Sequence, residues 1–410
     1  MGKQIKAMVF IFVCTSVAWL ILGSVTNIRT YNQNLKLKTA VSQLWGSQQK
    51  QQAPVVYYQT NFQEKVETVQ GAKTITEMKT RVVNNYVNIN SSDINADLDL
   101  EHRKKGLLWY STYKVKFNGK YTIENNTGIQ RAFFFDYTFP NKDGIYDNFS
   151  FIIDNKEVKD LLPVCGHITK GIYLKPGETA EIVLNYESQG MDNWWYIFGS
   201  DVSQIENFNL ILTTNFNNVD FPDEGISPTK KIKTDKGWKL IWKYSSLISG
   251  IQIGVDLPKK LNPGPFASKV SYFAPVSLFL FLFLMFIITT IKKVNIHPMN
   301  YFFISAAFFS FHLLMSYLAN HMAIQIVFII CSAVSIFLVI SYMRLVVGTR
   351  FALIEIGIAQ FVYLVMFSFA FFLEGYTGLS ITICCILTLF VVMQFTGKID
   401  WSKEFINKVE

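Results

Sequence analysis

Five long apolar runs follow one another closely after Lys269, and they constrain the fold more than any other feature of this chain. The runs are Ser271–Ile291, Met299–Leu318, Met322–Met343, Phe351–Leu373 and Tyr376–Thr396. A helix needs about 20 apolar residues to cross the roughly 30 Å of hydrocarbon in a bilayer. Each run is close to that length, and buried soluble helices are a poor explanation for five of them in one block. Residues 269–398 are therefore predicted to form a five-helix transmembrane bundle.

A sixth apolar run extends from Ala7 to about Val25 and follows the basic residues Lys3 and Lys6. A cleaved signal peptide is the competing interpretation, because it also begins with positive charge. Its apolar core is usually about 7–15 residues long and ends in small residues at an Ala-x-Ala-like site. This run is longer and no such site follows it. Residues 1–26 are therefore predicted to be an uncleaved membrane anchor.

Lysine and arginine are distributed unevenly among the loops between these runs. The loops that carry them contain Lys292 and Lys293, Arg344 and Arg350, and Lys398, Lys403 and Lys408. The short loops 319–321 and 374–375 contain neither residue type. Because lysine and arginine collect on the cytoplasmic side of a membrane, both termini are predicted to be cytoplasmic, with a short tail at residues 399–410. Residues 27–268 then lie outside the cytoplasm.

The formal net charge of +8 could suggest a nucleic-acid partner. Basic cytoplasmic loops explain a positive membrane protein more simply. No basic stripe with interleaved aromatic residues is found, so no nucleic-acid partner is expected. The lipid bilayer is the partner that the composition predicts, since hydrophobic residues make up 50% of the chain.

The polar middle of the chain has the alternating pattern of β-strands. Period-two alternation with β-branched and aromatic residues appears at 82–89, 113–117 and 182–186. Turn signals occur at Asp143–Gly144, Lys175–Glu178 and Asp235–Gly237, and Asn118–Gly119 suggests a type I′ hairpin. Residues 30–52 lack these signals until Gly46 and are predicted to be a helix or an extended stalk. The domain is therefore predicted to be mainly antiparallel β, arranged as a sandwich.

An aromatic cluster in this domain has two explanations. Trp194, Trp195, Tyr196 and Phe198 lie within five positions of one another. Aromatic side chains line ligand grooves, but they also build cores and membrane-facing edges. The core or edge is the favoured interpretation, and a binding groove is the alternative.

No constellation of residues in the chain is specific for catalysis. A nucleophile elbow, a phosphate-binding loop and a zinc-protease motif are all absent from the sequence. No pair of cysteines or histidines has the spacing of a metal site, and no cofactor motif is found. The chain is therefore predicted not to be an enzyme and to carry neither a metal nor a cofactor.

Polar residues within the apolar runs are the candidate functional residues, because polar groups are costly in lipid. They are Glu355, five residues after Arg350, His312 toward the outer face, and Gln325 early in its run. The alternatives are structural: Glu355 could pair with Arg350 at the interface, and His312 could bond to a neighbouring backbone or hydroxyl group. Convergence of Glu355, His312 and Gln325 on one cavity would favour transport. Separate packing partners would favour an anchor.

The sequence also resembles a known family at three places in its C-terminal part. Residues 296–301 include His297–Pro298 at the start of a run, residues 313–321 end that run at His321, and residues 397–401 follow the last run. Together they resemble the CreD family of bacterial inner-membrane proteins, over roughly residues 250–401. Residues 254–256 fit the segment that precedes the bundle in this family. His297–Pro298 has the features of a helix start, and His321 is a further candidate for binding.

The resemblance implies an association with envelope stress, with two-component regulation and with tolerance to colicins and β-lactams. It implies no catalytic residue. The leading hypothesis is a non-enzymatic envelope protein whose outer domain binds or senses an envelope partner while the bundle anchors it. A transporter of small solutes or lipids that uses the bundle is the alternative. The ligand and the oligomeric state are left open.

Overall fold

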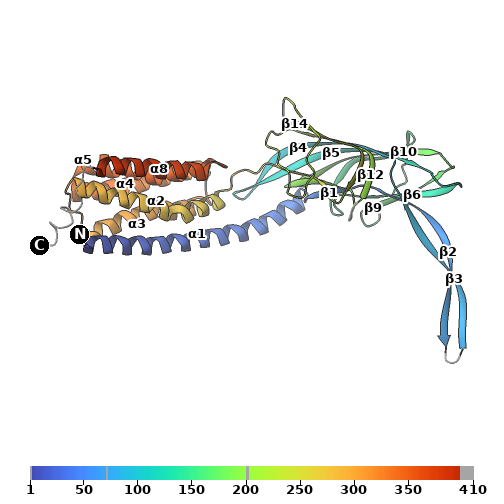
Figure 1. The fold of residues 1–410 in the computed structure, drawn as a ribbon, viewed down its shortest axis with the longest axis horizontal. Coiled ribbons are helices and arrows are strands. Elements are labelled where there is room, and N and C mark those ends of the chain that lie inside the picture. The colour runs from blue at the N-terminus through green and yellow to red at the C-terminus, as the bar shows by residue number, and fades with distance from the viewer. Residues whose placement is uncertain (1, 71–72, 200–202, 398–410) are drawn as a thin grey trace. The chain divides into compact units, whose positions relative to one another are not determined.

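All six apolar runs form helices in the computed structural model, which describes residues 2–70, 73–199 and 203–397 (Figure 1). The helices are α1 (Gly2–Leu44), α2 (Pro263–Ile291), α3 (Pro298–Leu318), α4 (Ile324–Val347), α5 (Thr349–Phe351), η1 (Ala352–Ile356), α6 (Gly357–Gln360), η2 (Phe361–Met366), α7 (Phe367–Phe369), η3 (Ala370–Phe372) and α8 (Thr377–Thr396). The segments from α5 to η3 form one continuous helix, Thr349–Phe372. Six helices in the described ranges are long and apolar enough to cross a membrane.

Local sequence explains where these helices begin and end. Pro263 and Pro298 are the first residues of α2 and α3, where the missing proline N–H costs nothing. The His297 side chain accepts a hydrogen bond from the backbone N–H of Met299, so His297–Pro298 starts a helix as predicted. Gly348 separates α4 from α5, with a φ of +87° that L-residues with a Cβ rarely adopt.

The fifth apolar helix contains two π-helical stretches, η1 and η2. A π stretch shifts the backbone hydrogen bonds by one residue, and such stretches often occur at functional sites. The sequence pattern predicted this span but not its irregular backbone, because hydropathy reports burial in lipid and not hydrogen-bond register.

The middle of the chain is a large, mainly antiparallel β region. Its strands are β1 (Gln49–Gln52), β2 (Val55–Gln70), β3 (Lys73–Val87), β4 (Ser91–Lys105), β5 (Leu108–Glu124), β6 (Arg131–Thr138), β7 (Tyr146–Ile153), β8 (Lys156–Glu157), β9 (His167–Leu174), β10 (Thr179–Met191), β11 (Asn193–Ile197), β12 (Ser203–Thr214), β13 (Lys230–Lys233), β14 (Trp238–Ser249) and β15 (Ile253–Asp256). They form three sheets, ordered β1-β11-β15, β13-β14-β12-β4-β5-β10-β7-β8 and β3-β2-β6-β9. The pairs β1–β11 and β4–β12 are parallel. The predicted β character is confirmed.

The predicted hairpin at Asn118–Gly119 is wrong. Both residues lie inside β5, where they pair with Asn185 and Leu184 of β10. The Asn118 side chain donates a hydrogen bond to the Asn185 side chain, and a Cβ on Gly119 would press on Phe117 and Tyr121. Asn118 therefore contributes a cross-strand hydrogen bond, and Gly119 leaves room for the neighbouring aromatic side chains. A type I′ turn is a local preference, and here long-range pairing overrides it.

The other three turn signals are turns. The N–H of Gly144 donates to the carbonyl of Asn141 at 3.1 Å. The N–H of Glu178 donates to the Lys175 carbonyl at 3.0 Å, and this turn leads into β10 as expected. The third turn, closed by Thr234 and Gly237, joins β13 to β14. The segment predicted as a helix or stalk is helical to Leu44 and then enters β1.

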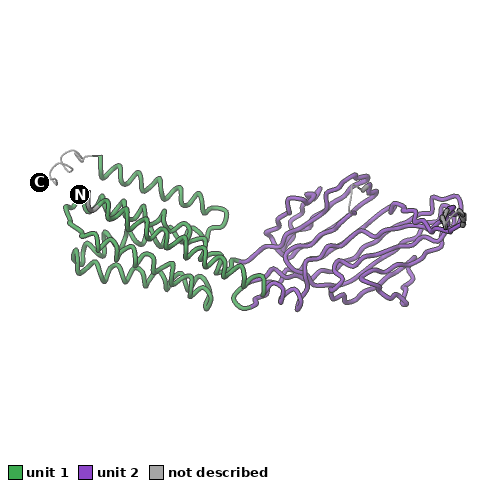
Figure 2. Tube along the Cα trace, turned by 90° about the horizontal axis from the view of Figure 1, so that it is seen from below, with its two compact units in different colours: residues 1–36, 106–108, 261–410 green, residues 37–105, 109–260 purple. Residues whose placement is uncertain are grey.

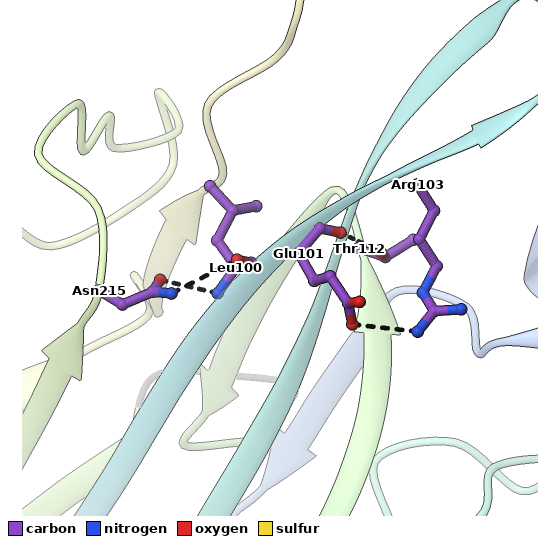
Figure 3. Close-up of polar contacts among 5 residues, drawn as sticks. All are labelled: Leu100, Glu101, Arg103, Thr112 and Asn215. Atoms are coloured by element: carbon purple, nitrogen blue, oxygen red, sulfur yellow. Dashed lines mark hydrogen bonds and ion pairs between the residues drawn. The ribbon is translucent and has the colours of Figure 1, made fainter.

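The side chain of Asn215 continues the hydrogen bonding to β4 just beyond the end of β12 (Figure 3). β12 pairs in parallel with β4 as far as Thr214, opposite Leu98. The next residue, Asn215, accepts a hydrogen bond from the N–H of Leu100 at 2.8 Å through its carboxamide oxygen, and its amide nitrogen reaches the Leu100 carbonyl. The carboxamide thus satisfies the backbone groups of β4 where the partner strand has ended.

Aromatic residues dominate the core of the β region. Trp194 and Tyr196 from the aromatic cluster are buried there, which supports the core interpretation over a groove. The buried Gln51 side chain accepts hydrogen bonds from Tyr137 at 2.7 Å and Tyr186 at 2.8 Å. A buried amide is tolerated because its oxygen is satisfied twice.

The chain divides into two compact units (Figure 2). Unit 1 comprises residues 1–36, 106–108 and 261–410, and unit 2 comprises residues 37–105 and 109–260. The domain boundaries predicted from the sequence, at residues 26, 268 and 398, remain predictions. The last of these and the tail at residues 399–410 lie outside the described residues.

Candidate functional site

Glu355, the acidic candidate of the bundle, is paired. It lies in η1, and its carboxylate forms an ion pair with the ammonium of Lys292, the C-cap residue that follows α2. Arg350, the partner considered from the sequence, is exposed. Two different helices therefore meet at this ion pair, which neutralises the carboxylate near the end of the membrane span.

His312 is buried on α3 and packs against aromatic rings. Its ring centroid lies 5.3 Å from that of Trp19 on α1, and 4.9 Å from that of Phe311. Its Nδ1 lies 3.3 Å from the carbonyl of Phe308, while Nε2 has no hydrogen-bond partner among the described residues. The bonding to a neighbouring backbone that the sequence suggested is therefore present, within the same helix.

The remaining candidates are exposed and separate from one another. His297 caps the start of α3, His321 lies in the turn after α3, and Gln325 is in the first turn of α4. Glu355 lines a cavity between the fifth apolar helix and α8, and the lining of that cavity includes neither His312 nor Gln325. In the described part of the chain, no group of three or more His, Cys, Asp or Glu residues could hold a metal ion.

A buried polar chain inside the bundle was missed by the sequence reasoning. The Gln360 amide donates to the hydroxyl of Ser335 at 2.9 Å, and Ser335 donates in turn to the carbonyl of Ala307 at 2.7 Å. This chain links the fifth apolar helix to α4 and α3. Gln360 was detectable as a polar residue within the run Phe351–Leu373, but its depth in the bundle depends on helix rotation, which hydropathy does not report.

A second set of hydroxyl contacts joins the same helix to α2 and α8. The hydroxyl of Ser277 on α2 donates to the carbonyl of Tyr363, a residue of the π stretch η2. The Tyr363 hydroxyl is bonded to that of Thr388 on α8 at 2.8 Å. In lipid, such bonds hold helices together where the hydrophobic effect cannot.

Helix α1 is attached to the bundle by polar contacts of its own. The guanidinium of Arg29 donates to the carbonyl of Ser316 at 2.7 Å and lies over the ring of Tyr317. The hydroxyls of Thr26 and Ser316 are 2.6 Å apart. Because Ser316 is in the last turn of α3, its carbonyl lacks a helical partner, and Arg29 supplies a donor.

In unit 2, the β2–β3 hairpin extends beyond the rest of its sheet (Figure 1). β2 pairs with β6 only from Val55 to Tyr58, while its pairing with β3 continues to Gln70. The apolar side chains of Phe62, Met78, Val82 and Tyr86 on this hairpin are 54–69% exposed. A two-stranded hairpin is marginally stable alone in water, and exposed apolar groups on it mark an interaction surface.

The fold and these contacts define a class of protein. It is a multi-span membrane protein in which a large β-rich domain is inserted between the first and second apolar helices. Residues 245–402 match the model of the family described as inner membrane protein CreD. The resemblance drawn from His297–Pro298 and the neighbouring motifs is therefore confirmed over this segment, and the family that it matches is one of inner-membrane proteins.

No curated protein matches the chain. A solved structure from Legionella pneumophila, described as that of a candidate nutrient-binding protein, is similar with 11% sequence identity and a TM-score of 0.32. The similarity covers 57% of this chain and 75% of the other. A TM-score at this level does not establish a shared fold.

Proposed function

We propose that this chain is a non-enzymatic protein of the bacterial inner membrane whose β-rich domain binds or senses a partner in the envelope. The observation that carries the proposal is the β2–β3 hairpin. Its outer part, residues 59–70 and 73–84, presents open backbone edges and exposed apolar side chains. Such an edge can pair with another extended strand, and natural proteins usually cover or charge their edges. An open edge with apolar side chains therefore favours a binding role.

The orientation follows from the loop charges. Lys292 and Lys293 precede α3, whereas the turn between α3 and α4 at residues 319–323 has no lysine or arginine. With six spans, both termini are cytoplasmic and the β-rich domain is periplasmic. An envelope partner can then reach the hairpin from outside the cytoplasm.

The resemblance to the CreD family supports a role in envelope stress and in tolerance to colicins or β-lactams.

We also propose that the sheets of the β-rich domain are arranged as a sandwich. One core cluster in unit 2 draws side chains from all three sheets, among them Val56 of β2, Ile94 of β4 and Trp194 of β11. Sheets that share a core in this way are typically stacked face to face.

A transporter of small solutes or lipids remains the second candidate function. The observation in its favour is the π-helical backbone around the buried Gln360, since π stretches are frequent at functional sites. The separate positions of Glu355, His312 and Gln325 favour the anchor instead.

The test replaces residues 60–83 by an Asn–Gly turn that joins Gln59 to Asn84. These two side chains already bond across the hairpin at 3.2 Å, and β2 still pairs with β6 in the shortened chain. The shortened chain should fold and reach the membrane, yet lose the β-lactam and colicin phenotypes of a gene deletion. Ile129→Ser, an exposed apolar change elsewhere in unit 2, serves as the control. Full tolerance from the shortened chain would refute a hairpin-mediated role.

A further inference from the structure

A long apolar groove lies on the surface of unit 1. It is lined by the helix Thr349–Phe372, by α8, and by Leu284 and Ile288 of α2, and it has a volume of about 800 Å³. The groove extends from Ile354 to Leu373. At a rise of 1.5 Å per residue this is about 28 Å, close to the hydrocarbon thickness of a bilayer.

The lining of the groove favours an apolar ligand. Among its exposed side chains are Ile358, Met366 and Leu387. Its two central hydroxyls, on Tyr363 and Thr388, are bonded to each other, so they need no polar ligand. A polar solute would lose its hydration here and gain few hydrogen bonds in return.

One end of the groove is charged. Glu355 lines this end, and Lys292 neutralises it through the ion pair. Lys293 adjoins Lys292 in the chain, and Arg350 lies one helical turn before Ile354. Both are exposed, and neither forms an ion pair within the described residues. This end of the groove therefore carries surplus positive charge.

We propose that the groove binds one phospholipid with an anionic headgroup. The acyl chain lies along the groove and the phosphate contacts Lys293 and Arg350. Basic pockets between membrane helices are suited to anionic headgroups, and the planar guanidinium of arginine matches a phosphate. This site is independent of the β2–β3 hairpin, and it requires no transport.

The test uses the full chain purified in detergent, with phosphatidylglycerol and phosphatidylcholine that carry identical acyl chains. Native mass spectrometry counts the bound lipid. One phosphatidylglycerol per chain should bind, at least tenfold more tightly than phosphatidylcholine. Arg350→Gln should weaken phosphatidylglycerol binding about fivefold, the effect of one basic residue at a membrane surface. Arg344→Gln, an exposed arginine in the last turn of α4 that does not line the groove, is the matched control.

A second pair of variants tests the groove itself. Leu387→Trp adds bulk to an exposed position in the groove and should reduce phosphatidylglycerol binding at least tenfold, while Ile329→Trp on the exposed face of α4 should leave it unchanged. Thermal unfolding checks that each variant is folded. Equal binding of the two lipids, or equal effects of Arg350→Gln and Arg344→Gln, would overturn the proposal. A dimer of the chain that Leu387→Trp dissociates would show that a protein helix fills the groove instead.

Discussion

At the scale of single residues, close packing between strands limits which substitutions unit 2 tolerates. Gly190 of β10 lies opposite Tyr113 of β5, and a Cβ at Gly190 would clash with the tyrosine ring. The ring is fully buried, and its hydroxyl donates to the carbonyl of Asn193 at 2.8 Å. It cannot move aside without losing that bond.

Gly190→Ala is therefore expected to lower the free energy of unfolding of unit 2 by about 2 kcal/mol, the usual cost of overpacking. Denaturant unfolding of the full chain in detergent, followed by the strand signal in circular dichroism, measures the change. Gly128→Ala is the control, because no atom lies within 4 Å of its Cβ position. Equal losses in both variants would contradict the packing argument.

At the scale of elements, polar contacts near its middle attach α1 to the bundle. Arg29 donates to the carbonyl of Ser316, which also accepts a longer hydrogen bond from the Asn320 side chain, and Thr26 bonds to the hydroxyl of Ser316. Deeper along the helix, Trp19 is buried against Phe308 and Phe309 of α3. Lipid solvates an apolar helix about as well as a helical bundle does, so α1 packs on the bundle because of specific contacts such as these.

Arg29→Ala should destabilise unit 1 by about 2 kcal/mol, the value of a hydrogen bond from a charged donor. The expected readout is a lower thermal unfolding temperature in detergent, together with faster proteolysis of α1. Lys36→Ala, a basic residue exposed on the same helix, should change neither quantity. If the two variants behave alike, Arg29 does not hold α1 in place.

The hydrogen-bonded chain through Gln360 was not predicted from the sequence because it depends on how each helix is rotated. Residue type and position marked Glu355, His312 and Gln325 as candidates, and all three lie in helices where expected. Which of them faces a neighbour depends on the rotation of each helix, which is set by packing between helices. Packing placed Gln360 inside the bundle and Gln325 on its surface.

At the scale of the whole molecule, unit 2 should respond to alkaline pH. Burial raises the pKa of five of its tyrosines above the ordinary value of 10.0: Tyr113, Tyr121, Tyr137, Tyr186 and Tyr196. In the unfolded chain these phenols ionise near pH 10, whereas in the folded chain they remain protonated. The free energy of unfolding of unit 2 is therefore unaffected by these groups below pH 10. It falls as the pH rises above 10, because only the unfolded chain gains by losing the phenolic protons.

An alkaline titration of the full chain should therefore show cooperative loss of the strand signal above pH 10. Tyrosinate absorbance should rise in the same transition, because the buried phenols ionise when the sheets open. Gradual ionisation near pH 10, with the sheets intact, would contradict the burial of these side chains.

The six-span topology can be tested with the cysteines of the chain. Cys165 in unit 2 is exposed. A membrane-impermeant thiol reagent should label it in spheroplasts without permeabilisation. Lys293→Cys, on a Cys165→Ser background, should react only after permeabilisation, because the proposed orientation places its loop in the cytoplasm. Labelling of the Lys293→Cys chain in intact spheroplasts would show that the orientation is inverted.

The six apolar helices, the β character of the middle domain and the resemblance to the CreD family could all be predicted from the order of the amino acids. These features depend on composition and short periodicity, which act locally along the chain. Three features required the folded chain: the place of Asn118–Gly119 inside a strand, the ion pair between Glu355 and Lys292, and the apolar groove beside α8. Each of these depends on contacts between segments distant in the chain, where pairing and packing outweigh local preference.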